Sequence, residues 1–397
     1  MPNKVNAISN APVIASVVRS PFGKYLGGLS KVRADDLLAT LIKSLVASIP
    51  ALDPRMIDDV IIGDANQAGD DNRNVARMGS LLANLPVSVP GVTLNRLCGS
   101  SAEALVQAAR LIRSGDASIV LAGGVESMSR APWIVERLGD AAPEAPVFNQ
   151  STVGWRLINP AMPAQWTGSL GRSAELVAER FEISRQRQDE WALRSHLLAD
   201  AAWSSGFHSE WVLPIGGVQK DESIRPDTSL EKLLGLKSAF SEGGSVTAGN
   251  SSPLNDGATL SLITDKKTAS QLELNPIASI ISAQVVGTEP HEFSIAPVYA
   301  IRKLLQKQGL NIGDIDLWEI NEAFAAMVLS VLHELPEIDT ARVNVNGGAI
   351  AIGHPVGASA ARAVIDCARE LKRRGGRFGI AAACIGVGQG IAVLVQA

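Results

Sequence analysis

The sequence predicts an α/β protein built from two similar halves. Apolar stretches of strand-like composition alternate with segments of helical periodicity, which is typical of layered α/β folds. In the first half we expect strands at residues 12–18, 57–63 and 117–124, and helices at 34–49 and 100–114. The 397 residues exceed what one hydrophobic core usually holds, so we expect two or three domains.

The second half repeats this order of elements. Expected strands at 277–283, 315–321 and 378–383 resemble the three strands of the first half, and expected helices at 297–308 and 358–374 resemble its two helices. We therefore interpret the chain as one βαβαβ unit used twice, with a site where the two units meet.

Residues 126–248 differ from both halves. They contain many prolines and six of the seven tryptophans, together with an amphipathic helical stretch at 173–205. We interpret them as an insertion that covers the site and holds part of the substrate. The expected domains are residues 1–125 as the first part of the N-terminal half, 126–248 as the loop domain, 249–275 as the return to the N-terminal half, and 276–397 as the C-terminal half.

The composition argues against several classes of function. A net charge of −4 gives no basic field for nucleic acid or an anionic membrane. Three cysteines do not suggest a disulfide framework, and residues 1–6 show no apolar region of a signal peptide, so we expect a cytoplasmic protein. No phosphate-binding loop, dinucleotide fingerprint or metal-ligand spacing appears, so ATP, NAD and metals are not implied.

Two cysteines and a histidine stand in glycine-rich surroundings. Cys98 lies in NRLCGSS just before an expected helix, whose N-terminus would favour a thiolate, although a free cysteine is more often a buried apolar side chain. His354 lies in GGAIAIGHP, where small residues allow close approach of a ligand, although an ordinary loop histidine is the simpler alternative.

Cys384 precedes three glycines at an expected strand end. This segment is either a tight turn or a source of backbone N–H groups for an oxyanion hole. Cys367 is interpreted as core packing, and residues 71–73 and 255–257 as turns. Two thiols and an imidazole on such turns favour covalent thioester chemistry.

Five motifs in order along the chain resemble those of the thiolase family of acetyl-CoA acyltransferases. The resemblance covers essentially the whole chain, and its motifs are NRLCGS at 95–100, VTAGNSS at 246–252, NEAF at 321–324, GGAIAIGHP at 347–355 and CIGVGQG at 384–390. It implies a five-layer αβαβα fold of two similar halves with an inserted loop domain.

The resemblance also implies a role for each site residue. Cys98 would be the acylated nucleophile, and His354 the base that activates it and a donor to the thioester oxygen. Cys384 would move the α-proton of the acetyl unit, and Asn321 would order a water beside the histidine. The N–H groups of Cys98 and Gly386 would form an oxyanion hole.

Four further residues match positions that contact coenzyme A in the family: Arg225, Ala248, Ser252 and Phe324. The implied partners are acyl-CoA and CoA, with CoA as a cosubstrate, no permanently bound cofactor and no metal. We expect a homodimer or homotetramer that binds neither nucleic acid nor membranes.

The implied reaction is reversible cleavage of a 3-ketoacyl-CoA by CoA to acetyl-CoA and a shortened acyl-CoA, in the degradation of fatty acids or aromatic acids. Three alternatives stay open: biosynthetic condensation of acetyl-CoA, a silent acyl-CoA-binding homologue, and a decarboxylating condensing enzyme. The intact set of Cys98, His354 and Cys384 argues against the second and fits the third less well.

Some positions depart from the usual family pattern, namely Ser101, Ala102, Ser169 and Phe293. We expect them to reshape the acyl pocket, with Ser101 and Ala102 opening space near the nucleophile.

Residues 67–78 and 154–160 resemble the thiolases of aromatic-acid breakdown, which cleave β-ketoadipyl-CoA. The terminal carboxylate of such a substrate needs a cation. The candidates are Arg73, Arg77 and Arg156, each of which could equally be a surface or interface arginine.

Overall fold

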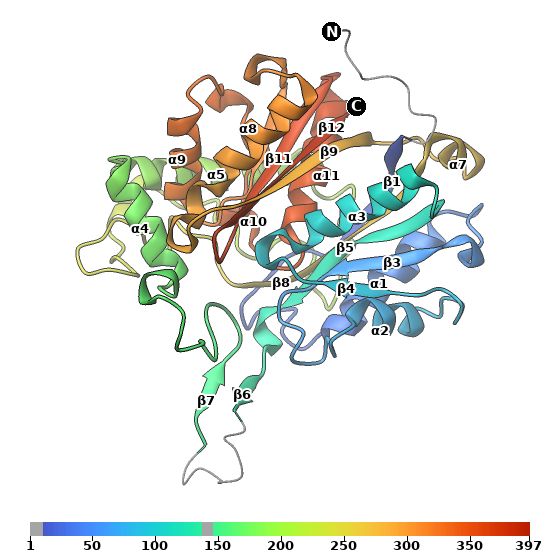
Figure 1. The fold of residues 1–397 in the computed structure, drawn as a ribbon, viewed down its shortest axis with the longest axis horizontal. Helices are drawn as coiled ribbons and strands as arrows, with labels where there is room; N and C mark the ends of the chain where they lie inside the picture. The colour runs from blue at the N-terminus through green and yellow to red at the C-terminus, as the bar shows by residue number, and fades with distance from the viewer. Residues whose placement is uncertain (1–10, 137–145) are drawn as a thin grey trace.

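The computed structural model describes residues 11–136 and 146–397 and has the layered α/β architecture expected (Figure 1). The first half contains the strands β1 (Pro12–Arg19), β2 (Gly23–Lys24), β3 (Asp59–Gly63), β4 (Val92–Leu94), β5 (Ile119–Ser127) and β8 (Asn255–Asp265). Its helices are α1 (Ala34–Ala47), α2 (Val75–Leu82), α3 (Ser100–Ser114) and α7 (Lys266–Gln271).

The second half has the corresponding set. Its strands are β9 (Ala278–Gly287), β10 (Leu317–Ile320), β11 (Phe378–Ile385) and β12 (Gln389–Gln396). Its helices are α8 (Ala296–Gln308), α9 (Ala325–Glu334), α10 (Ala349–Ile352) and α11 (Ser359–Arg374). All ten elements expected from the periodicity are present.

The order of the strands confirms the internal repeat. The first half runs β1-β8-β5-β3-β4 and the second β9-β12-β11-β10, and the two are joined by antiparallel pairing of β1 with β9. Both halves contain an equivalent parallel pair, β3–β5 or β10–β11, next to an antiparallel strand, β8 or β12, and the first half adds β4 in parallel to β3. Equivalent strands therefore end at equivalent places in the two halves.

Three large apolar cores fill the spaces between the five layers. One lies between α1–α2 and the first-half strands, and another between α8–α9 and the second-half strands. The third surrounds α3 and α11, which pack together between the two sets of strands. In Figure 1, α1 and α2 lie at the lower right and α8 and α9 at the upper left, with α3 between them.

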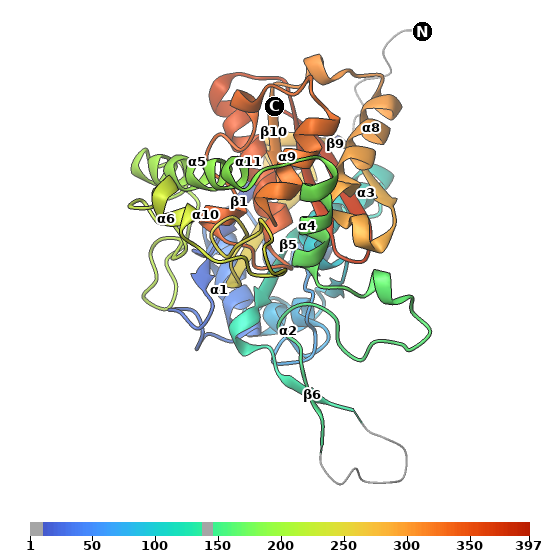
Figure 2. The same ribbon diagram turned by 90° about the vertical axis from the view of Figure 1, so that its left-hand side faces the viewer.

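The inserted region consists of β6 (Trp133–Val135), β7 (Phe148–Gln150), α4 (Leu170–Arg180), α5 (Arg185–Ser204) and α6 (Leu230–Leu234). The single helical stretch expected at 173–205 is wrong, because Glu182 takes a left-handed φ of 52° and Ser184 caps a new helix at α5. The β6–β7 hairpin projects away from the body in both ribbon views (Figures 1 and 2).

The interpretation of residues 255–257 as a turn is also wrong. They begin β8, and the Asn255 amide donates to the Gly23 carbonyl at 2.9 Å inside the protein. The domain boundaries at 125, 248 and 275 stay a prediction. Across residues 11–136 and 146–397, no helix has both the length and the apolar character needed to cross a membrane.

Candidate active site

Cys98 lies in a tight turn between β4 and α3. Residues 97–99 form one turn of 3-10 helix, and Leu97 has a left-handed φ of 45°, a conformation that costs a non-glycine residue about 1–3 kcal/mol. The Ser100 hydroxyl holds the turn, accepting from the Arg96 N–H at 2.8 Å and donating to the Leu97 carbonyl at 2.7 Å. The thiol is thus fixed at the start of α3 with 7% of the residue exposed.

Burial determines the charge of this thiol. It raises the pKa of Cys98 to about 11, while the neighbouring N–H of Gly386 lowers it by a smaller amount. Burial therefore opposes the expected effect of the helix N-terminus on Cys98, and the neutral thiol is the favoured form in the free protein. At neutral pH Cys98 is a thiol and needs a base.

His354 is held from three directions. Gly353 has a φ of 115°, and a Cβ on it would lie 2.7 Å from the Asn255 side chain, so only glycine fits. The His354 N–H donates to Asn255 Oδ1 at 2.9 Å, and its ring Nδ1 hydrogen-bonds the Ser359 hydroxyl at the start of α11. These contacts fix both the backbone and the plane of the imidazole.

The other ring nitrogen of His354 is available for chemistry. Burial, and secondarily Arg362, lower the pKa of His354 to about 4, so the imidazole is neutral at pH 7. When Nδ1 carries the hydrogen and donates it to Ser359, Nε2 is an acceptor. Nε2 is buried and has no hydrogen-bond partner among the residues that the structure describes.

Cys384 lies in β11, and Asn321 directly follows the adjacent strand β10. The Asn321 N–H donates to the Ala382 carbonyl at 2.8 Å, which places the end of β10 beside Cys384. Burial and the neighbouring Cys98 raise the pKa of Cys384, so the two thiols are close together and both protonated. Both side-chain polar atoms of Asn321 are buried without a partner in the described part of the chain, whereas most such atoms have one.

Two buried carboxylates organise the site and were not expected from the sequence. Glu322 accepts from Trp191 Nε1 at 3.0 Å, Ser195 Oγ at 2.6 Å, Asn344 Nδ2 at 2.9 Å and the Ile350 N–H at 3.2 Å. It therefore joins the end of β10 to α5 and to the segment that leads to the site histidine. Its place in the NEAF motif was the only signal in the sequence.

Glu126 is the second organising carboxylate. It accepts N–H groups of Ala65 at 3.0 Å, Asn66 at 3.2 Å and Gly357 at 2.8 Å, and burial raises its pKa to about 7. It joins the two halves just after His354.

A cavity of about 290 Å³ opens above the nucleophile. Cys98 and Gly386 form its floor, and one wall comes from the inserted region through residues 151–156 and Leu170. His354, Cys384 and Asn321 do not line it. The structure thus places the sulfur at the boundary between this cavity and the buried polar groups.

The four residues expected to bind CoA lie outside this cavity. Arg225 and Ala248 are exposed, whereas Phe324 is buried. Ser252 and Phe324 are neighbours, because the Ser252 N–H donates to the Ala323 carbonyl at 2.9 Å. The backbone N–H of Arg225 donates to His196 Nδ1 on α5 at 3.2 Å.

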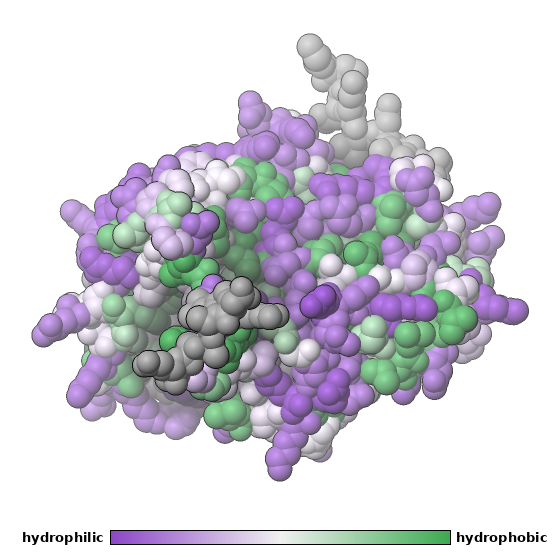
Figure 3. Space-filling model, turned by 60° about the horizontal axis from the view of Figure 1, so that its bottom comes forward, coloured by the Kyte–Doolittle hydropathy of each residue, from purple (hydrophilic) through white to green (hydrophobic). Residues whose placement is uncertain are grey.

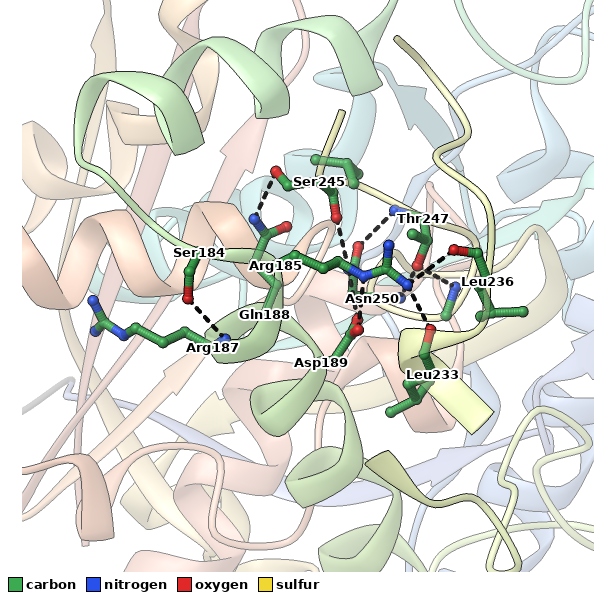
Figure 4. A network of polar contacts seen from close by, with 12 residues as sticks. Ser184, Arg185, Arg187, Gln188, Asp189, Leu233, Leu236, Ser245, Thr247 and Asn250 are labelled. Carbon is green, nitrogen blue, oxygen red and sulfur yellow. Dashed lines mark hydrogen bonds and ion pairs between the residues drawn. The ribbon is translucent and has the colours of Figure 1, made fainter. Parts of the chain in front are cut away.

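Helix α5 also holds the loop at 245–252 (Figure 4). Asn250 accepts from the Thr247 N–H at 2.8 Å and donates to Asp189 at 2.9 Å, and Arg185 pairs with Asp189 at 2.7 Å. Ala248 and Ser252 therefore sit on a braced loop.

The unusual residues lie in two different places. Ser101 accepts the Ala361 N–H at 2.9 Å between α3 and α11, and Ala102 is part of the central core. The expectation that these two residues open space near the nucleophile is wrong, because neither lines the cavity.

The other two unusual residues, Ser169 and Phe293, line a small hollow next to the cavity. The hollow and the cavity share Trp155 and Leu170. Cys367 is buried in the central core, as expected.

Comparison with known proteins gives the same family along the chain. The model of the thiolase N-terminal domain matches residues 12–267, and that of the thiolase C-terminal domain matches residues 274–397. A 3-oxoadipyl-CoA/3-oxo-5,6-dehydrosuberyl-CoA thiolase of Escherichia coli is 48% identical over 96% of this chain and 98% of its own length. A beta-ketoadipyl-CoA thiolase of Acinetobacter baylyi is 45% identical over the same shares.

Solved structures agree with the sequence relatives. The human mitochondrial 3-ketoacyl-CoA thiolase has a TM-score of 0.91 and 36% identity, covering 98% of this chain and 100% of that one. The Bacillus anthracis acetyl-CoA acetyltransferase has a TM-score of 0.90 and 39% identity, covering 97% and 98%.

The fold and the paired cysteines define an acyltransferase that works through CoA thioesters. The chain belongs to the thiolase family. It cleaves a 3-ketoacyl-CoA with CoA, as cosubstrate, to acetyl-CoA and a shortened acyl-CoA, and the reaction is reversible.

Proposed function

We propose that this thiolase cleaves a short 3-oxoacyl-CoA with a terminal carboxylate, such as 3-oxoadipyl-CoA, in the degradative direction. The observation that carries the proposal is the mixed lining of the cavity above Cys98. Its walls combine the apolar side chains of Val153, Trp155 and Leu170 with the polar side chains of Asn66 and Thr152, which suits a short chain that ends in a polar group. The volume of about 290 Å³ is near the lower end of small-molecule pockets and suits a short chain. Relatives 44–48% identical are named for this substrate.

In the proposed first half-reaction, His354 Nε2 accepts the proton of Cys98 and the thiolate attacks the C3 carbonyl carbon. The C2–C3 bond then breaks, leaving the acyl group on the sulfur. The departing acetyl-CoA enolate takes a proton at C2 from Cys384. In this step the N–H groups of Cys98 and Gly386 both donate to the acyl oxygen.

In the proposed second half-reaction, the Cys384 thiolate takes the proton of the incoming CoA thiol. The CoA thiolate attacks the acyl carbon, and Cys98 leaves and recovers its proton from His354. Asn321 fits the role of holding a water beside His354, because both ends of its amide are buried and unpaired among the described residues. Arg225, Ala248, Ser252 and Phe324 remain the proposed contacts for CoA.

We also propose that the protein is a homo-oligomer. The β6–β7 hairpin exposes Trp133 by 65%, Val147 by 68% and Phe148 by 60%, and a lone hairpin cannot bury its own side chains. Among the described strands, β4 lies at one edge of the large sheet. Figure 3 looks onto the end from which the hairpin projects and shows hydrophobic groups gathered there. Light scattering coupled to size-exclusion chromatography tests this, and a monomer at micromolar concentration contradicts it.

The substrate proposal is tested by comparing kcat/KM for 3-oxoadipyl-CoA, acetoacetyl-CoA and 3-oxooctanoyl-CoA. We expect 3-oxoadipyl-CoA to be the best of the three. If it is the poorest, the substrate proposal is wrong, while membership of the thiolase family is unaffected.

A further inference from the structure

The cavity above Cys98 contains one feature that the thiolase reaction itself does not require. Within the described residues, Arg156 is the only cationic side chain in its lining. The single acidic side chain there, Glu126, is occupied by three backbone N–H groups. Arg156 is only partly buried, so water can solvate its guanidinium, and a ligand in the cavity can replace that water.

The immediate partners of Arg156 leave its charge uncompensated. Its Nη2 donates to the Asn66 carbonyl at 3.1 Å, and its Nη1 lies 3.5 Å from Asn66 Oδ1. These neutral oxygens orient the guanidinium. In the part of the chain that the structure describes, Arg156 forms no ion pair with a carboxylate, even though Glu136 lines the adjacent hollow. Asn66 is itself anchored to Ser151 and to Glu126.

The two other candidate arginines do not share these properties. The two terminal nitrogens of Arg77 each donate to a backbone carbonyl before β4, one to Val89 and the other to Val87. Arg73 is exposed in a turn and does not line the cavity. The sequence offered three arginines as candidates for the carboxylate, and of these only Arg156 lines the cavity.

We infer that Arg156 binds the terminal carboxylate of the acyl group and determines the preference for dicarboxylic substrates. This inference rests on the proposed function. In the acyl-enzyme formed from 3-oxoadipyl-CoA, the carboxylate is three carbon–carbon bonds from the carbon attached to the Cys98 sulfur. A guanidinium held by Asn66 presents a planar pair of donors to such a carboxylate. Trp155 and Leu170 line the same cavity and contact the methylene groups between the two ends.

The arrangement also rejects neutral chains. A substrate that ends in a methyl group displaces water from Arg156 without replacing its hydrogen bonds, and sites built for a polar partner discriminate strongly against analogues that lack it. Arg156 is therefore a specificity-determining residue that lies outside the proton-transfer machinery.

The test compares two six-carbon substrates, 3-oxoadipyl-CoA and 3-oxohexanoyl-CoA, which differ only in the terminal carboxylate or methyl group. In Arg156→Gln we expect kcat/KM for 3-oxoadipyl-CoA to fall about 10- to 100-fold, the range of a charged hydrogen bond. For 3-oxohexanoyl-CoA we expect a change of less than about threefold. Arg156→Lys keeps the charge without the planar fork and should recover part of the loss.

Arg73→Gln is the matched control, since it removes the same group from the exposed turn, and both substrates should keep their wild-type values. An equal loss for both substrates in Arg156→Gln would show that Arg156 only supports Asn66 and would overturn the inference. An unchanged preference would also overturn it.

Failure of the proposed function itself looks different. In that case the wild-type protein already fails to prefer 3-oxoadipyl-CoA over 3-oxohexanoyl-CoA. Thermal unfolding of each variant establishes that it is folded, so that a loss of activity reports on recognition.

Discussion

The backbone N–H of Gly386 lies beside the sulfur of Cys98 and lowers the pKa of that thiol. One residue belongs to the turn after β11 in the second half, and the other precedes α3 in the first. The contact therefore crosses the junction between the repeated units and places a backbone N–H of the second half beside the nucleophile of the first. A Cβ on Gly386 would meet only ordinary contacts, at 3.4 Å from Leu170 and 3.6 Å from Leu97, so the role of this position lies in its N–H.

The buried thiol and imidazole predict a specific pH dependence. With a pKa of about 11 for Cys98 and about 4 for His354, both groups are neutral between these values. Because a raised thiol pKa leaves the reactive thiolate scarce below it, the rate of alkylation of Cys98 by iodoacetamide should rise about tenfold per pH unit from 7 to 10. A plateau reached near pH 7 would instead indicate a stable thiolate–imidazolium pair. Cys98→Ala serves as the blank.

The roles of Cys384 and His354 separate in two assays. Cys384→Ala should still be acylated at Cys98, yet lose exchange of the acetyl-CoA α-protons into deuterated water by about two to four powers of ten. His354→Ala should lose acylation itself by a similar factor. Normal α-proton exchange in Cys384→Ala would show that another group carries that proton.

Glu322 is predicted to stabilise the site rather than to react. Glu322→Ala removes the acceptor of four buried donors, and each donor left unpaired costs about 1–3 kcal/mol, so urea unfolding should show a loss of at least about 3 kcal/mol. Glu322→Gln keeps the shape and part of the acceptor capacity and should lose less. Equal stability of Glu322→Ala and the wild type would rule out this role.

Much of the fold could be predicted from the sequence because its strands and long helices carry strong periodicity. β1, β5, α3 and α11 are apolar or amphipathic over many residues, and their repetition revealed the two halves. The elements that were missed have weaker local signals. α2 has only eight residues, and β8 begins with Asn255, whose turn-like chemistry is used instead to hold His354.

The identity of the main site residues could be predicted from the sequence, whereas their charge states could not. Motifs brought Cys98, His354, Cys384 and Asn321 to attention, but the charge state of Cys98 depends on burial by both halves, which no local pattern reports. The roles of Glu126 and Arg156 likewise depend on contacts with residues that are distant in sequence. The choice of Arg156 over Arg73 and Arg77 required knowing which side chains line one cavity.

The central claim is that the acyl group passes through Cys98. The protein is incubated with acyl-CoA without free CoA, quenched and digested, and the adduct is located by mass spectrometry. We predict the acyl mass on the peptide that contains Cys98, and none in Cys98→Ala. An adduct on Cys384 or Cys367 with Cys98 unmodified would contradict the account.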